Sequence, residues 1–236
     1  MANWSQHKLI YDLGVHQGRD TEQYLRKGFR VVGVEASPIL AAEVRERLGS
    51  FISSGQFTLL NIGIWHEVGE IPFYRNLDKD DWSSFDAAYG CRNGTAFEVL
   101  NVPTITLGDL VREHGVPYYM KVDIEGADKH VVKAMGALPH LPDYTSAEEY
   151  GVQIIDDLLA AGYKRFHLAP QNHKVPPAEP QQSLEGITVP CKFGGHHSGV
   201  FGRDIADWQE SGAFREHFKR ALADRVNEWY DVHATL

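Results

Sequence analysis

The stretch Ile10-Tyr-Asp-Leu-Gly-Val-His-Gln-Gly-Arg-Asp-Thr21 decides the fold of this 236-residue chain. An apolar run carries an acidic residue near its end, and Gly14 and Gly18 then bracket three residues before a helical pattern begins. The next apolar run, Val31–Val34, ends on Glu35. This order predicts a strand, a tight glycine turn, a helix and a second strand tipped with a carboxylate. Such a unit can seat a nucleoside-bearing cofactor at the carboxyl ends of parallel strands.

The composition limits the class of protein and its partners. The chain carries 32 Asp and Glu against 23 Lys and Arg, and this acidic balance argues against a broad nucleic-acid surface. No apolar run approaches the roughly 20 residues that span a bilayer, and the polar segment Met1–Lys8 lacks the apolar core of a secretory signal. Cys91 and Cys191 show no metal or redox spacing. We therefore expect a cytoplasmic protein with two free thiols and no membrane or nucleic-acid partner.

Strand-like and helical patterns alternate along the chain, which predicts an α/β fold with a mainly parallel sheet flanked by helices. We expect strands over 9–15, 30–35, 57–64, 118–125, 144–150 and 164–168, a short hairpin strand near 71–73, and helices over 19–27, 38–48, 106–115, 127–137 and 152–161. We also expect a terminal helix whose apolar stripe comprises Phe214, Phe218, Leu222, Val226 and Trp229. This stripe is expected to pack on the core rather than to form a dimer contact.

Two connections lack periodicity. Residues Leu77–Thr95 are long for a loop inside a domain, so we expect a functional lid there. The Pro-rich segment Pro170–Pro190 is expected to be irregular. No linker divides the chain, so we expect one domain over 1–236 with a variable C-terminal extension from about residue 170.

The glycine turn favours one cofactor over another. A dinucleotide-binding turn needs a second glycine where this chain has Val15, so a pyrophosphate would lack its usual bare backbone. The spacing suits a ligand without phosphate in the turn, such as S-adenosylmethionine, whose ribose diol would face Glu35. The glycines alone are equally typical of an ordinary tight turn, and the ordered strand, helix and Glu35 favour the cofactor.

Several segments between residues 9 and 150 together resemble the FkbM family of S-adenosylmethionine-dependent methyltransferases, which has the Rossmann-like class I fold. They are Asp12–Gly18, Gly33–Pro38, Asn61–Trp65, Trp82–Asp86, Thr104–Asp109 and Met120–Ala127. The most specific is Lys121-Val-Asp-Ile-Glu-Gly126. The resemblance implies a seven-stranded, mainly parallel sheet. It also implies methyl transfer to a hydroxyl oxygen of a small sugar-like or natural-product acceptor.

The fourth predicted strand is unusual because it carries charge. Lys121, Asp123 and Glu125 share one face by the period of two, and buried charges are unfavourable unless they are paired. These groups either line a polar cleft or form a purely structural network. A hydroxyl nucleophile must lose a proton, so Asp123 is our first candidate base, with Glu125 and Lys121 in support. Further candidates are Glu149, His167 and the pair His196 and His197, each histidine being more typical of a structural or solvated residue.

The remaining expectations concern cofactor contacts and rival functions. Residues expected to bind the cofactor are Asp12, Gly14, His16, Gly18, Thr21, Glu35, Ala36, Ser37, Asn61, Ile62, Ser83, Ser84 and Asp123. Asn61 and Ile62 would lie beside the adenine, and the lid serines would bond the ligands. No metal is expected, since no ligand spacing is diagnostic. A small-molecule N-methyltransferase, an NAD-dependent oxidoreductase and a non-catalytic interaction module remain alternatives, and a homodimer remains open.

Overall fold

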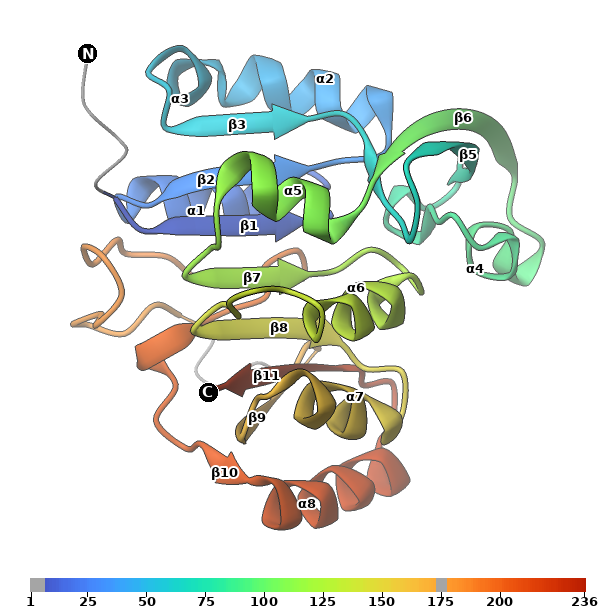
Figure 1. Cartoon of the computed structure of the whole chain (residues 1–236). Coiled ribbons are helices and arrows are strands. Elements are labelled where there is room, and N and C mark those ends of the chain that lie inside the picture. The colour runs from blue at the N-terminus through green and yellow to red at the C-terminus, as the bar shows by residue number, and fades with distance from the viewer. Residues whose placement is uncertain (1–6, 173–177) are drawn as a thin grey trace.

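The computed structural model describes residues 7–172 and 178–236, in which a central sheet has the strand order β10-β9-β11-β8-β7-β1-β2-β3 (Figure 1). Its strands are β1 (Leu9–Leu13), β2 (Arg30–Val34), β3 (Phe57–Leu60), β7 (Tyr119–Val122), β8 (Tyr144–Glu148), β9 (Arg165–Pro170), β10 (Gln209–Glu210) and β11 (Tyr230–Thr235). Strands β1, β2, β3, β7 and β8 run parallel to one another, while β11 runs antiparallel to β8 and β9. The predicted α/β class is confirmed. The described sheet has eight strands rather than seven, because the two-residue strand β10 adds an edge.

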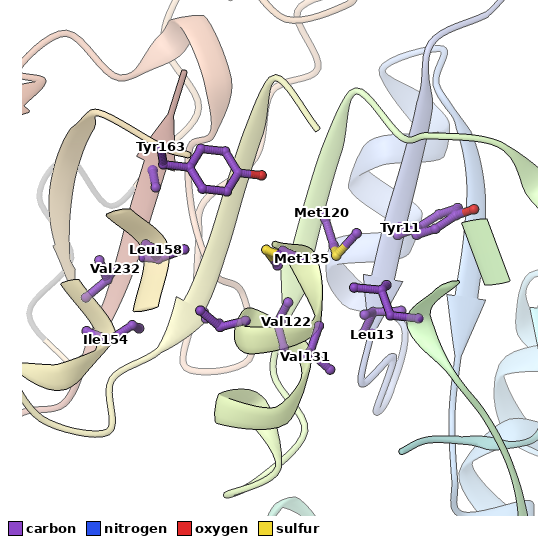
Figure 2. Close-up of a cluster of buried hydrophobic side chains, with 14 of the residues drawn as sticks. Tyr11, Leu13, Met120, Val122, Val131, Met135, Ile154, Leu158, Tyr163 and Val232 are labelled. Carbon is purple, nitrogen blue, oxygen red and sulfur yellow. The ribbon is translucent and has the colours of Figure 1, made fainter. Parts of the chain in front are cut away.

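Helices cover both faces of this sheet. They are α1 (Arg19–Arg26), α2 (Pro38–Arg47), α3 (Gly49–Ser53), α4 (Ala87–Gly90), α5 (Leu107–His114), α6 (Asp128–Met135), α7 (Gln153–Ala161) and α8 (Ser211–Asp224). In Figure 1, α5, α6 and α7 lie in front of the sheet and α1 lies behind it. The larger apolar core fills the front face, where Met120 and Val122 of β7 meet Val131 and Met135 of α6 (Figure 2). Within the described residues, every helix is too short or too polar to cross a bilayer.

The capping signals in the sequence are confirmed. Ser37 is the N-cap of α2, accepts a hydrogen bond from the Leu40 amide at 3.4 Å, and is followed by proline in the first turn. Thr106 caps α5 in the same way, accepting from the Asp109 amide at 3.1 Å. Each cap starts its helix directly after a strand, which keeps the connection short.

The chain leaves the main sheet after Leu60, so the prediction of one strand over 57–64 is wrong. Residues Gly63–Ile64 form β4 of a separate sheet, ordered β4-β6-β5, with β5 (Gly69–Asn76) and β6 (Phe97–Ile105). The physical reason is local. The Asn61 side chain donates to the backbone carbonyls of Glu35 and Ala36 at 2.8 and 3.2 Å, which turns the chain away from β2. Figure 1 shows the small sheet beyond the carboxyl ends of β1, β2 and β3.

The C-terminal prediction is wrong in part. Helix α8 ends at Asp224 with Phe214 and Phe218 buried as expected, but Val226 lies beyond it and is 76% exposed. Residues Tyr230–Thr235 form strand β11 inside the sheet, which the periodicity did not reveal. Its residues alternate between apolar and polar side chains, which is typical of a strand, but the predicted apolar stripe of a terminal helix ran through Val226 and Trp229 directly before it.

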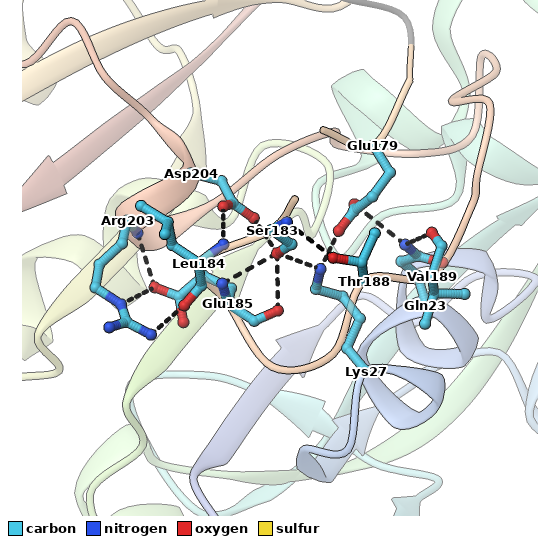
Figure 3. Close-up of polar contacts among 10 residues, drawn as sticks. All are labelled: Gln23, Lys27, Glu179, Ser183, Leu184, Glu185, Thr188, Val189, Arg203 and Asp204. Carbon is cyan, nitrogen blue, oxygen red and sulfur yellow. Dashed lines mark hydrogen bonds and ion pairs between the residues drawn. The ribbon is translucent and has the colours of Figure 1, made fainter. Parts of the chain in front are cut away.

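The segment after β9 packs against the end of α1 and is fixed by buried polar contacts (Figure 3). Lys27 forms an ion pair with Glu179, and both side chains are at least 97% buried. Lys27 Nζ also donates to Ser183 Oγ at 2.8 Å, and Ser183 Oγ lies 2.6 Å from Asp204 Oδ2. The segment Pro170–Pro190 was predicted to be irregular, and its described part is irregular after the end of β9, apart from an isolated bridge at Ala178. Residues 173–177 of this segment lie outside the described residues.

Gly14 is the point where the glycine turn touches the end of β7. Its φ is +90°, and an added Cβ would lie 1.7 Å from the carbonyl oxygen of Asp123. The Asp123 amide in turn donates to the Leu13 carbonyl at 2.9 Å. The two loops can come this close only because residue 14 has no side chain.

We expect Gly14→Ala to lower the free energy of unfolding by about 3 kcal/mol or more, because the methyl group forces the two loops apart. Gly28→Ala is the matched control: its φ is +91° and no atom lies within 4 Å of the added Cβ. In the control, only the strain of the left-handed backbone should lower the free energy of unfolding, by about 1–2 kcal/mol. Urea denaturation measures both, and equal losses would contradict the close-contact explanation.

Candidate active site

A cavity of about 450 Å³ opens at the carboxyl ends of β1, β2, β7 and β8. A volume of this size suits a small molecule or cofactor. Its walls come from four segments: the glycine turn after β1, the tip of β2, the loop after β5 and the loop Gly195–Ser198. The ends of β7, β8 and β11 complete it. This is the position at which open parallel sheets bind ligands.

Glu35, at the tip of β2, presents a buried carboxylate to this cavity. Its two oxygens accept backbone amide hydrogen bonds from His16 at 2.7 Å and from Ser37 at 2.8 Å. Burial raises the pKa of Glu35 to about 7, although the two amide bonds oppose that shift. A carboxylate oxygen can accept more than one hydrogen bond. The group is therefore fixed in direction and can still receive a diol from the cavity.

Lys121 is the centre of a buried ion-pair network on β7. Its ammonium nitrogen lies 3.4 Å from Asp12, 3.5 Å from Asp20 and 3.1 Å from Asp123. Burial disfavours the charge of Lys121, yet these carboxylates raise the pKa of Lys121 well above its usual value. The structural network considered from the sequence is therefore present. The Asp123 side chain is 43% exposed and lines the cavity, so one member of the network also faces a ligand.

The alternation predicted for this strand stops at Val122, where β7 ends. Glu125 has a φ of +46° and belongs to the loop that follows. Asp123 and Glu125 nevertheless both line the cavity, together with Lys121. The loop geometry, rather than the period of two, brings them together.

Asp123, Glu125 and Glu148 form a carboxylate cluster in the cavity, with oxygens within 4.8 Å of one another. Burial, then the charges of Glu125 and Asp123, raise the pKa of Glu148 to about 10. Burial and Asp123 raise the pKa of Glu125 to about 8, while Arg92, 3.1 Å from Glu125, opposes the shift. The spacing is compatible with a divalent cation, and the expected absence of a metal stays a prediction.

The expected lid lies at the cavity. Trp82, Ser83 and Phe85 line it, whereas Ser84 is buried and donates to the carbonyl of Glu125 at 2.6 Å. This bond ties the loop to the end of β7. The guanidinium of Arg92 lies 4.2 Å from the centre of the Trp82 ring.

A contact beside the glycine turn joins three loops. His16 Nε2 of the glycine turn lies 3.2 Å from Asp80 of the lid. The rings of His16 and His196 have centroids 5.4 Å apart. All three residues line the cavity, so the glycine turn, the lid and the Gly195–Ser198 loop meet there.

The sequence-predicted site residues divide into two groups. Those that line the cavity are Gly14, His16, Glu35, Ala36, Ile62, Ser83, Lys121, Asp123, Glu125, His196 and His197. Those that lie outside the lining are Asp12, Gly18, Thr21, Ser37, Asn61, Ser84, Glu149 and His167.

Most of the second group support the lining from behind. Thr21 Oγ1 donates to Asp12 at 2.5 Å, and both side chains are fully buried. Two candidates point elsewhere: Glu149 pairs with Arg225, and His167 Nδ1 lies 2.8 Å from Asp207. Glu148, the neighbour of Glu149, is the β8 carboxylate that reaches the cavity.

The lining residues that were not predicted as site residues include Asp20, Glu148, Gln171, Trp229 and Asp231. Glu148 is one position away from a predicted candidate, and a strand boundary two residues shorter would have found it. Trp229 and Asp231 were missed because β11 was not predicted. No local pattern marks Asp20, which faces inward from the first turn of α1.

Comparison with known proteins gives one family match and several distant structural similarities. The model of the methyltransferase FkbM domain matches residues 12–154. A precorrin-6y C5,15-methyltransferase from Geobacter metallireducens aligns with 10% identity and a TM-score of 0.44, covering 97% of this chain and 78% of that one. An S-adenosylmethionine-dependent O-methyltransferase from Thermotoga maritima aligns with 11% identity and a TM-score of 0.40, covering 98% and 60%. No curated relative matches significantly. At these TM-scores the structural alignments carry no information on the substrate.

The raised pKa values predict how stability depends on pH. An acid whose pKa is higher in the folded state holds its proton longer there, so its contribution is fully present below its unfolded pKa, near 4.5, and is lost as the pH rises. We expect the ligand-free protein to lose stability between pH 5 and pH 10. Glu148→Gln should be more stable than the wild type by about 1 kcal/mol at the upper end of this range and should show a shallower slope. Urea denaturation across the pH range measures this.

Glu149→Gln is the control for this experiment, since Glu149 is adjacent in sequence but lies outside the cavity lining and pairs with Arg225. Its pH slope should follow the wild type. If the free energy of unfolding of Glu148→Gln depended on pH as it does in the wild type, the carboxylate cluster would not destabilise the folded protein.

Proposed function

Because the chain belongs to the FkbM family of methyltransferases, which use S-adenosylmethionine, we propose that it methylates a hydroxyl oxygen of a small polar acceptor in this cavity. The observation that carries the proposal is that Glu35 and Asp123 line the same cavity from two different strand ends. Glu35 provides acceptor oxygens for a ribose diol, and Asp123 provides an acceptor for the proton of a hydroxyl nucleophile.

The residues around Glu35 fit the nucleoside part of this cofactor. Val34, Ala36, Leu40 and Ile62 supply an apolar lining next to the Glu35 carboxylate. An adenine ring needs such a surface, and a ribose needs such an acceptor. Val15 also lines the cavity, so a side chain stands where a dinucleotide pyrophosphate would need bare backbone. This favours S-adenosylmethionine over NAD.

Two chemical tasks remain for the protein. The cofactor, when bound, supplies a methyl group already activated for displacement, so alignment and proximity dominate the protein's contribution. Asp123 accepts the proton that the acceptor hydroxyl loses, which in enzymes of this kind contributes about 10²- to 10⁴-fold in rate. Lys121, at 3.1 Å, holds the Asp123 carboxylate in place. Glu125 and the lid residues Trp82 and Phe85 shape the acceptor side and exclude water.

The proposed partner is therefore a small molecule. The lack of nucleic-acid binding and the possible homodimer stay predictions.

Removing the Glu35 carboxylate should weaken cofactor binding. We expect Glu35→Ala to lower affinity for S-adenosylhomocysteine by roughly 10- to 100-fold, because two charge-assisted hydrogen bonds to the ribose are lost. Isothermal titration calorimetry measures this. Glu43→Ala, on the exposed side of α2, is the control and should bind like the wild type. Equal affinity in Glu35→Ala and the wild type would refute the ribose contact.

Neutralising Asp123 should affect turnover more than cofactor binding. We expect Asp123→Asn to lower kcat by about 10²- to 10⁴-fold while S-adenosylhomocysteine affinity stays within about threefold. Radiolabelled methyl transfer and calorimetry give the two quantities. Asp143→Asn, at an exposed position after α6, should leave both unchanged. Undiminished turnover in Asp123→Asn would remove Asp123 from the mechanism.

A further inference from the structure

One wall of the cavity is built from residues outside the part that matches the family model. Gln171, Ser198, Trp229 and Asp231 all line the cavity, and all follow residue 154. Strand β11 pairs with β8 so that Asp231 lies directly opposite Glu148. Gln171 is joined to Trp229 by a backbone hydrogen bond of 3.0 Å. We call Glu148, Gln171, Ser198, Trp229 and Asp231 the C-terminal wall.

The wall contains two buried residues whose side-chain oxygens have no hydrogen-bond partner in residues 7–172 and 178–236. The Ser198 side chain belongs to a residue only 8% exposed, and its hydroxyl makes no hydrogen bond with residues 7–172 or 178–236. Gln171 is 7% exposed; its side-chain amide nitrogen donates to the Ala169 carbonyl at 3.3 Å, and its side-chain oxygen is unbonded within the same ranges. Both residues line the cavity, so a ligand bound there can donate hydrogen bonds to these two oxygen atoms.

The position of Ser198 is fixed by Asp20. The Ser198 amide donates to both oxygens of Asp20, at 3.1 and 3.0 Å, and Asp20 lies 3.5 Å from Lys121. The wall is therefore tied to the same ion-pair network that holds Asp123. The position of a group bound to Ser198 is therefore fixed relative to Asp123, the proposed base.

The wall also belongs to a cavity in which carboxyl groups outnumber cationic side chains. Among the described lining residues, eight are carboxylates and three are Lys or Arg. Lys121 is already shared by three carboxylates, and Arg92 pairs with Glu125. The Glu148 side chain makes no hydrogen bond or ion pair within residues 7–172 and 178–236, although four other carboxyl groups act on it. An ammonium group would supply the missing positive charge and hydrogen-bond donors together.

We propose that the C-terminal wall binds a protonated amino group of the methyl acceptor, so that the acceptor is an amino alcohol or amino sugar. This rests on the proposed function. The ammonium would donate to Glu148, to the Gln171 oxygen and to Ser198, with the Trp229 ring beside it. A protonated amine has no free electron pair, so the wall that holds it also prevents its methylation. The neighbouring hydroxyl then loses its proton to Asp123 as its oxygen forms the new carbon–oxygen bond and the carbon–sulfur bond breaks.

The test compares two molecules of nearly the same shape. Serinol (2-amino-1,3-propanediol) and glycerol differ only in carrying an ammonium or a hydroxyl at the central carbon. Each is titrated into the protein saturated with S-adenosylhomocysteine, and binding is followed by NMR chemical shifts. We expect serinol to bind at least about tenfold more tightly than glycerol. Glu148→Gln should remove most of this preference, while Glu149→Gln should keep it.

Each outcome decides the matter. No preference for serinol, no binding of serinol at all, or an equal loss in Glu148→Gln and Glu149→Gln would overturn the inference. The same holds if MgCl₂ binds and displaces serinol, because the wall would then be a metal site. Binding of S-adenosylhomocysteine is measured in the same samples. Its absence would overturn the proposed function itself, whereas its presence without a preference for serinol would overturn only the amine subsite.

Discussion

The buried ammonium of Lys121 is the interaction on which the rest of the site depends. It contacts Asp12 on β1, Asp20 on α1 and Asp123 after β7, so three elements share one positive charge. Taking Lys121 away would leave the buried carboxylates of Asp12 and Asp20 without this cation, which is strongly unfavourable. The network thereby fixes the end of β7 against the glycine turn, where Gly14 allows direct contact with Asp123.

The part of the cavity around the glycine turn and Glu35 could be predicted from sequence because its signals are local. A strand, two glycines, a capped helix and Glu35 follow one another within a short stretch, and each has a stereochemical reason. The acceptor side could not be predicted in the same way. Glu148 was missed by one position, and Asp231 was missed because the segment before it was assigned to the stripe of a terminal helix and β11 was not predicted. Positions such as Asp20 depend on contacts between segments far apart in sequence, which no local pattern encodes.

Errors in the predicted elements have the same origin. The strand expected over 57–64 is apolar throughout, yet the Asn61 side chain ends its pairing by bonding the backbone beyond β2. The predicted apolar stripe of the terminal helix extended beyond the end of α8, because Val226 and Trp229 are apolar and lie at helical spacing. In the structure these residues belong to the connection to β11, where Trp229 turns to the cavity. Tertiary contacts outweighed periodicity in both places.

The split of the cavity between two parts of the chain has a consequence for divergence. The residues proposed to hold the cofactor fall within the segment 12–154, which the family model matches, whereas most of the C-terminal wall lies after it. Substitutions at Gln171, Ser198 or Trp229 would change the ligand that fits while leaving the grip on the methyl donor in place. A few substitutions in this wall could thus change the acceptor during evolution, while each intermediate sequence keeps the residues proposed to bind the methyl donor.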